Sequence, residues 1–491
     1  MRAVKTTPSV SRRRGAAGFL PRLRAGRGLL ALALLPSLAA DAAEEPLTPA
    51  AAQELRQALL PPSARAIPTD PESPRLTFEE AIELALRKNP TVLAAQQDIR
   101  RAQALVEQAR AGALPTLNLA ASYLRLDGDR VLESADGPPG SGRVIAGANQ
   151  LAGTVTVAAP LLAPARWAQW LHAADAVKVA QGGAREASRL LAIATARAYL
   201  AVVTQTRLLQ VSASAREVAQ AHYLFAEQRY HGGVGTYLDQ VRAGQELATS
   251  EAQLAAAHSA IFRAREALGV LVGVDQAIDC TGEPELTTPP ELAGGPERLG
   301  DEALVLRGDL RLLQLRAWAA ARLVRDSWVD YLPTLVGSVG PFYQNPPTLT
   351  QPLLGWQALL SLTVPLYDGG LRYGVQHERA ALYVQSKLNI QQGQRQARSE
   401  VRAAHEALQR AAQARQATHR AAELAAQAVE LSLIAYRAGA TTNLEVVDAE
   451  RRARDAAIAD TQAQDAERQS HLDLLIASGY FPTSDGRAPS P

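Results

Sequence analysis

The segment Tyr230-His231-Gly232-Gly233-Val234-Gly235-Thr236-Tyr237-Leu238 recurs as Tyr436-Arg437-Ala438-Gly439-Ala440-Thr441-Thr442-Asn443-Leu444. Each copy follows about 69 residues, at 163–231 and 369–437, that are rich in Ala, Leu, Arg and Gln and nearly free of proline. As a helix, each such stretch would span roughly 100 Å at 1.5 Å per residue. A second helical stretch follows each copy. The sequence therefore predicts two long helical hairpins, with tips near 232–236 and 438–442.

Two more pairs of segments indicate that the chain is a duplication. Leu114-Pro115-Thr116-Leu117 recurs as Leu332-Pro333-Thr334-Leu335, and Pro160-Leu161 recurs as Pro365-Leu366. Near these motifs, apolar and polar side chains alternate, which indicates strands with one apolar face and one wet face. The strands are expected near residues 114–125, 151–160, 332–343 and 356–366. Helical stretches are expected ahead of them, near 77–113 and 301–331.

Basic residues are concentrated at the start of the chain. Eight lie within residues 1–27, and the thirteen uncharged residues Gly28–Ala40 follow, ahead of Ala-Asp-Ala at 40–42. This order is typical of a cleaved signal peptide. Thirteen residues are too few for a membrane-spanning helix, which needs about 20. We therefore expect residues 1–42 to direct export and to be removed. No lipid-anchor cysteine is expected, because Cys280 is the only cysteine.

The composition argues against several classes of function. Hydrophobic residues make up 47% of the 491 residues, so the chain as a whole is not intrinsically disordered. Residues 1–42 hold eight basic residues and one acidic residue, so their removal changes the net charge from +2 to −5. Nucleic-acid binding is therefore not expected. The eight histidines form no His-x-x-x-His pair, and we expect no enzyme activity, metal or cofactor. No later run of 18 uncharged apolar residues predicts a membrane helix.

Several short motifs together carry a resemblance to a known family. In chain order they are Leu76-Thr77-Phe78-Glu79-Glu80-Ala81, Asn89-Pro90, Leu114–Leu117, Val364–Gly370, Tyr436–Gly439 and Val446–Ala449. Across nearly all of residues 76–478, and twice over, their order resembles that of the TolC-like outer membrane efflux proteins. The second repeat departs from this pattern at one place, where Arg307-Gly308 replaces Asn-Pro.

The resemblance implies a fold that is mainly α with a small β part. Each protomer would contribute two long helical hairpins and four strands to a homotrimer. The trimer would join a 12-stranded β-barrel in the outer membrane to an α-helical barrel in the periplasm of a Gram-negative bacterium. The implied partners are outer-membrane lipid, a periplasmic adaptor (membrane fusion protein) and an inner-membrane pump. The expected domains are a signal peptide at 1–42, repeat one at 43–272, an equatorial linker at 273–300, repeat two at 301–478 and a C-terminal tail at 479–491.

The resemblance also implies roles for residues near the tips. Glu445 and Asp448 match acidic rings at the pore constriction, and Asp239 and Tyr436 match positions that bond across hairpins to close the tip. Thr441 stands where the best-known family member has an arginine, so a charge-locked closure is not expected. The expected adaptor-docking residues are Gly232, Gly233, Val234, Gly439 and Ala440.

Simpler structural roles compete with these functional ones. Thr236-x-x-Asp239 and Thr442-x-x-Glu445 both match the capping box, in which an acidic side chain bonds the start of its own helix. The tip glycines are also helix stops. For Asp448, the alternative to a gate is an ion pair with Arg242, its counterpart in repeat one.

Two functions from different classes remain open at this stage. The leading hypothesis is the outer-membrane channel of a tripartite efflux or type I secretion system, acting as a passive exit duct. The alternative is a periplasmic coiled-coil adaptor or scaffold protein without a pore. The presence of two hairpins, each preceded by a strand pair, favours the channel.

Overall fold

The structure is a computed structural model that describes residues 74–132, 143–284, 294–348 and 350–482. The predicted signal peptide lies outside the described residues. So do the middle of the 273–300 linker and most of the 479–491 tail. The described part is mainly helical with a small β part, which confirms the predicted secondary-structure content of the protomer.

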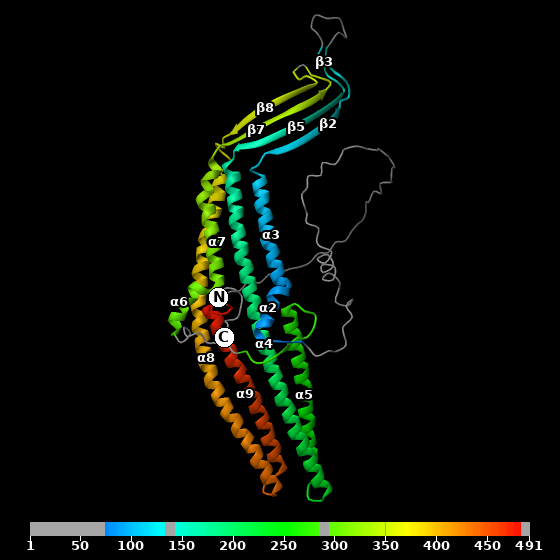
Figure 1. The fold of residues 1–491 in the computed structure, drawn as a ribbon, viewed down its shortest axis with the longest axis vertical. Coiled ribbons are helices and arrows are strands. Elements are labelled where there is room, and N and C mark those ends of the chain that lie inside the picture. The colour runs from blue at the N-terminus through cyan, green and yellow to red at the C-terminus, as the bar shows by residue number, and fades with distance from the viewer. Residues whose placement is uncertain (1–73, 133–142, 285–293, 349, 483–491) are drawn as a thin grey trace, which may run out of the picture. The chain divides into compact units, whose positions relative to one another are not determined.

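The elements follow one another in the same order in both halves of the chain (Figure 1). The first half contains α2 (Phe78–Lys88), α3 (Pro90–Ala111), β2 (Thr116–Arg125), β5 (Asn149–Leu162), α4 (Pro164–His231) and α5 (Tyr237–Val272). The second half contains α6 (Pro296–Leu306), α7 (Gly308–Arg325), β7 (Thr334–Asn345), β8 (Leu354–Thr363), α8 (Leu371–Arg437) and α9 (Asn443–Ser478). Short strands β1 (Arg75–Leu76), β3 (Arg130–Leu132), β4 (Arg143–Ala146) and β6 (Asp279–Cys280), and a 3-10 helix at Asp326–Tyr331, complete the described elements.

The helical stretch ahead of each strand pair is broken into two helices where a single stretch was predicted. In repeat one the break falls at Asn89, which precedes Pro90 in the chain. The Asn89 side chain accepts a hydrogen bond from Thr91 N at 2.8 Å. In repeat two the break falls at Arg307, whose backbone angles are nearly identical (φ −66°, ψ 126° against −66°, 128°). Arg307 is held by Asp309 and Glu400. Different side chains therefore impose the same break in the two repeats.

A four-stranded antiparallel sheet with the order β2-β5-β7-β8 joins the two repeats through the β5–β7 pair. Gly340 sits where β7 approaches β5 so closely that an added Cβ would lie 1.7 Å from the carbonyl oxygen of Val155. Within the described residues, β2 and β8 are edge strands with no further partner. Their large apolar side chains are exposed, with Leu119 at 78% and Trp356 at 75%.

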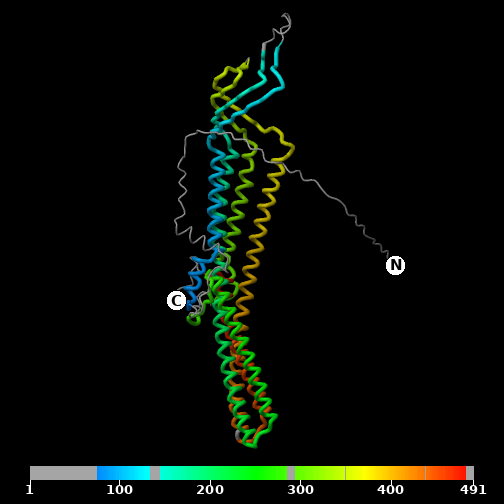
Figure 2. The backbone as a smooth tube through the Cα atoms, turned by 90° about the vertical axis from the view of Figure 1, so that its right-hand side faces the viewer, coloured from blue at the N-terminus to red at the C-terminus, as the bar shows by residue number. Residues whose placement is uncertain are grey.

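The two hairpins, α4–α5 and α8–α9, are almost equal in length. Helices α4 and α8 contain 68 and 67 residues, and α5 and α9 contain 36 each. Helix α4 packs on both α5 and α9, so the hairpins contact each other. Both tips lie at the end opposite the sheet (Figures 1 and 2).

One stretch of α4 is long and apolar enough, by length and composition, to cross a membrane. In the structure, 56% of it is buried inside the chain. Buried residues of α4 include Leu191, Ala192, Ile193, Ala196, Tyr199, Leu200, Val202 and Val203. Packing inside the protein therefore accounts for its apolar character.

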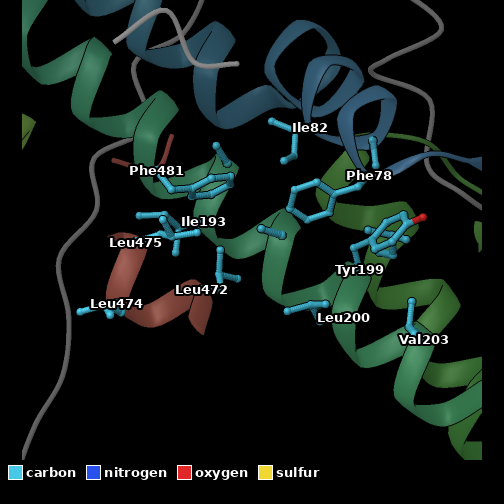
Figure 3. Packing of buried hydrophobic residues seen from close by; sticks show 14 of the residues in the cluster. Phe78, Ile82, Ile193, Tyr199, Leu200, Val203, Leu472, Leu474, Leu475 and Phe481 are labelled. Atoms are coloured by element: carbon cyan, nitrogen blue, oxygen red, sulfur yellow. The ribbon is translucent and has the colours of Figure 1, made fainter. Parts of the chain in front are cut away.

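The main hydrophobic core lies where the short elements meet the long helices (Figure 3). Phe78 of α2 packs edge-on against Tyr199 of α4, with ring centroids 5.4 Å apart, and also contacts Phe481. The Tyr199 hydroxyl donates to the carbonyl oxygen of Gly282 at 2.9 Å and lies 3.3 Å from that of Leu76. Ile278 and Leu299, from the described ends of the 273–300 linker, are buried in the same core. This core fixes the hairpins at one level and leaves their tips to be held by other contacts.

Candidate functional site

The tip of the first hairpin is a tight glycine turn. Helix α4 ends at His231, and Gly233 adopts a φ of +73°, a conformation that favours glycine. The Val234 amide closes the turn by donating to the carbonyl oxygen of Arg229 at 3.0 Å, and the Val234 side chain is 71% exposed. The predicted capping box at Thr236 and Asp239 is present, with the Asp239 amide donating to Thr236 Oγ1 at 3.2 Å.

The tip of the second hairpin has the same turn but a different start to its returning helix. Gly439 adopts a φ of +71°, and the Ala440 amide donates to the carbonyl oxygen of Ala435 at 2.8 Å. The capping box predicted at Thr442 and Glu445 is wrong, because Thr442 makes no side-chain cap bond. The Glu445 carboxylate instead accepts a hydrogen bond from the Thr441 hydroxyl. Thr441, which replaces the arginine of the best-known family member, therefore bonds Glu445 of its own hairpin.

The two acidic residues proposed for the pore constriction lie on one face of α9. Glu445 and Asp448 are one turn apart and exposed, opposite the face that buries Val446 and Val447. Asp448 Oδ2 lies 2.7 Å from Arg452 Nη2, on the same helix. Within this chain the Asp448 carboxylate pairs with Arg452 and not with Arg242, and it remains 53% exposed.

The two residues proposed for tip closure both contact the opposite hairpin, in each case through backbone atoms. The carbonyl oxygen of Asp239 accepts from Asn443 Nδ2 at 3.0 Å, and that of Tyr436 accepts from Arg229 Nη1 at 3.1 Å. The Arg229 guanidinium also lies over the Tyr436 ring, 4.8 Å from its centroid. The Tyr436 side chain is buried, and this burial raises its pKa. Arg229 of the first hairpin thus supplies a cationic link between the hairpins.

A buried polar cluster, formed by His222, Asn443 and Glu450, lies just behind the tips. His222 Nε2 is 2.7 Å from Asn443 Oδ1, and His222 Nδ1 is 3.0 Å from Glu450 Oε2. All three side chains are at least nine-tenths buried. Burial acts to lower the His222 pKa, but Glu450, through its hydrogen bond and charge, together with Asn443 and Glu246, holds that pKa above its ordinary value.

A second buried contact between the hairpins is an ion-pair cluster. Glu246 of α5 is 2% exposed and binds Arg451 and Arg454 of α9 at 2.6 and 2.5 Å. Glu246, Glu450 and Arg454 also border a cavity of about 420 Å³ between the hairpins, whose other walls are largely apolar. The tips are therefore held by polar contacts alongside a space that packing leaves open.

These buried residues were not identified from the sequence. His222, Glu246 and Glu450 occupy long amphipathic helices in which most charged side chains face solvent. Each is a polar residue at a position that the helical period assigns to the inner, apolar face. That pattern is hard to detect in an alanine-rich helix, where the apolar face is poorly defined. Among the described residues, no group of three or more His, Cys, Asp or Glu side chains is arranged to hold a metal ion.

Two repeats, each with a strand pair and a hairpin whose longer helix spans roughly 100 Å, define a protein of the class that forms channels of the TolC type. The family described as "Outer membrane efflux protein" matches residues 81–274 and 299–479, about three-quarters of the chain, and the chain belongs to this family. Its members are transport proteins of the outer membrane and not enzymes.

Solved structures share the fold at low sequence identity. A membrane protein from Pseudomonas aeruginosa has a TM-score of 0.69 and 19% identity, covering 83% of this chain and 91% of that one. The outer membrane protein VceC from Vibrio cholerae has a TM-score of 0.66 and 22% identity, covering 82% and 96%. Fusaric acid resistance protein FusA from Burkholderia cepacia is 27% identical over 205 residues. That match spans 40% of this chain and 38% of the relative.

Proposed function

We propose that this protein is the passive exit duct of a tripartite efflux or type I secretion system. An inner-membrane pump would deliver the cargo through a periplasmic adaptor, and the pump would set which cargo is carried. The observation that carries the proposal is the presence, in one chain, of a β-sheet with open edges and two hairpins whose longer helices span roughly 100 Å. Family membership supports a channel over a scaffold without a pore.

The sheet argues for an oligomer. Strands β2 and β8 have 10 residues each, enough to cross a bilayer when tilted. An open edge cannot remain unpaired in lipid, where backbone groups find no water. Pairing β8 of one copy with β2 of the next removes every edge, and three copies of four strands give a closed barrel of twelve. This homotrimer would place the exposed apolar residues of the strands against outer-membrane lipid.

The tips would form the periplasmic entrance. In a trimer, the exposed faces carrying Glu445 and Asp448 would converge as two acidic rings at the constriction. The like charges of such rings repel one another and concentrate cations in the pore. Asp239 and Tyr436, through their backbone contacts to the other hairpin, would hold the entrance closed. The glycine turns offer the adaptor a repeated docking edge formed by Gly232, Gly233, Val234, Gly439 and Ala440.

The test is conduction by the purified protein in planar bilayers. We expect a small, cation-preferring conductance, together with a heat-modifiable trimer recovered in outer-membrane fractions. A protein that inserts and never conducts, even when Glu445 and Asp448 are replaced, would contradict the duct. Recovery in a soluble periplasmic extract, with no insertion into bilayers, would favour the scaffold alternative.

A further inference from the structure

The His222–Asn443–Glu450 cluster contains a chain of hydrogen bonds whose direction is fixed. Asn443 Nδ2 donates to the backbone carbonyl oxygen of Asp239 at 3.0 Å, and a carbonyl oxygen can only accept. The Asn443 amide is thereby oriented with its own oxygen toward His222 Nε2, 2.7 Å away. Because that oxygen also only accepts, His222 Nε2 must carry a proton for the contact to be favourable.

The other ring nitrogen of His222 faces a second acceptor. Nδ1 lies 3.0 Å from Glu450 Oε2, and an ionised carboxylate only accepts. A neutral imidazole has a single N–H, so it cannot donate to Asn443 and Glu450 at once. All contacts are satisfied only while the His222–Glu450 pair holds one extra proton. The pair needs the same number of protons whether the extra one resides on the His222 ring or on the Glu450 carboxyl group.

The surroundings of the cluster come from all four helices of the two hairpins. Besides Glu450, α9 presents Arg451 and Arg454, which are bound to Glu246 of α5. From α8, the ring of Tyr436 lies edge-on to His222 with centroids 6.1 Å apart. On α4 itself, Arg229 lies over that tyrosine. Glu246 adds to the effect of Glu450 in raising the His222 pKa.

The pair also borders space through which protons can exchange. Glu450 lines the cavity of about 420 Å³ between the hairpins. A cavity of that volume with polar groups in its wall can hold water. Protonation of the pair can therefore change without unfolding either hairpin.

We propose that the His222–Asn443–Glu450 cluster is a proton-dependent latch that holds the two hairpins together behind the tips. With the proton in place, both ring nitrogens donate and the hairpins are joined. After its loss, one ring nitrogen must face an acceptor with its lone pair, and the buried contact becomes repulsive. A role for this latch in opening the periplasmic entrance rests on the proposed function as an exit duct.

The direction of the pH effect follows from the raised His222 pKa. A group whose pKa is higher in the folded state contributes stability below its unfolded pKa and loses that contribution as pH rises through the folded pKa. The latch is therefore closed in acidic solution and loosens as pH rises above the ordinary histidine range.

Amide hydrogen exchange of the full-length protein tests the latch. Protection of peptides covering residues 436–450 is measured at pH 6 and pH 9, each relative to the intrinsic chemical exchange rate at that pH. We expect the protection to fall roughly tenfold or more at pH 9, since a hydrogen bond to a charged group contributes at least that factor. His231→Gln, at an exposed histidine beside the tip, is the matched control and should behave like the unaltered protein.

Two variants should remove the pH dependence in opposite directions. In Glu450→Gln, a neutral His222 can donate from Nε2 to Asn443 and accept at Nδ1 from the new amide, so protection should stay high at both pH values. In His222→Leu, no side-chain donor remains for Asn443 or Glu450, so protection should be low at both. Unchanged protection of the unaltered protein between pH 6 and pH 9, or a His222→Leu variant that still responds to pH, would overturn the latch.

This measurement separates the latch from the proposed function. A protein that conducts in bilayers but whose tip protection ignores pH would refute the latch alone. A protein with pH-dependent tip protection that never conducts would refute the duct and leave the latch standing.

Discussion

Replacing Glu246 with alanine should weaken the contact between the hairpins by about 3 kcal/mol. The Glu246 carboxylate is 2% exposed, and one of its partners, Arg454, keeps only 10% of its side chain exposed. Removing one member of a buried pair leaves the other charge uncompensated, at a cost of about 3–5 kcal/mol. The second partner, Arg451, is 43% exposed, and pairs near the surface contribute only about 0–1 kcal/mol. The lower end of the free-energy range for breaking a buried ion pair is therefore the appropriate estimate.

Native-state amide exchange is the suitable assay, because it reports local opening of α5 and α9 without unfolding the whole protein. A loss of about 3 kcal/mol makes local opening more than a hundredfold more frequent, since each 1.4 kcal/mol is a factor of ten. Glu251→Ala on the same helix is the matched control. Glu251 lies 3.7 Å from Arg216 with 54% of its side chain exposed, and its removal should cost no more than about 1 kcal/mol.

A further variant separates the charge from the packing. Replacing Glu246 and Arg454 together by leucine removes both buried charges, and such replacements are often neutral or stabilising. Protection should then recover much of what Glu246→Ala loses. Equal losses in Glu246→Ala and Glu251→Ala would contradict this prediction, because burial of the charge would then carry no cost.

Three further predictions concern the gate, the docking edge and the sheet. Asp448→Asn should weaken cation preference and block by trivalent cations in bilayer recordings with trimer yield unchanged. Arg452→Ala should strengthen the preference, because it removes the cation 2.7 Å from Asp448; lost trimer stability with selectivity kept would disprove the gate. Val234→Trp should abolish export at normal trimer yield, and normal export would remove the tip from the docking surface. Gly340→Ala should prevent sheet assembly, seen as loss of the heat-modifiable trimer, because its Cβ would lie 1.7 Å from Val155 O.

Local signals in the sequence located the elements of the fold. Periodicity of two marked the strand regions, and long proline-poor stretches ending in glycine marked the hairpins. The break at Asn89 could have been read from Pro90, which lacks an amide proton to donate to the helix. The break at Arg307 had no such signal. It is held by Asp309, Glu400 and the carbonyl oxygen of Ala477, and the last two are distant in sequence.

The candidate site was predictable only where it depends on local structure. The turns at Gly233 and Gly439 follow from glycine's access to positive φ, and the Thr236–Asp239 capping box follows from its spacing. The matching box expected at Thr442 does not form, because Glu445 bonds Thr441 instead. Two acceptable local partners for one carboxylate cannot be ranked from spacing alone.

The duplication, the two hairpins, their glycine tips and the strand pairs could all be predicted from the sequence, because each depends on neighbours within a few turns of chain. Which polar side chains meet between the hairpins depends instead on how the helices pack. His222 and Asn443 are 221 residues apart, and His222 and Glu450 are 228 apart. Their contact depends on the register in which α4 lies against α9. That register is set by packing at the shared core, and shifting one helix by a single residue would turn these side chains away from each other.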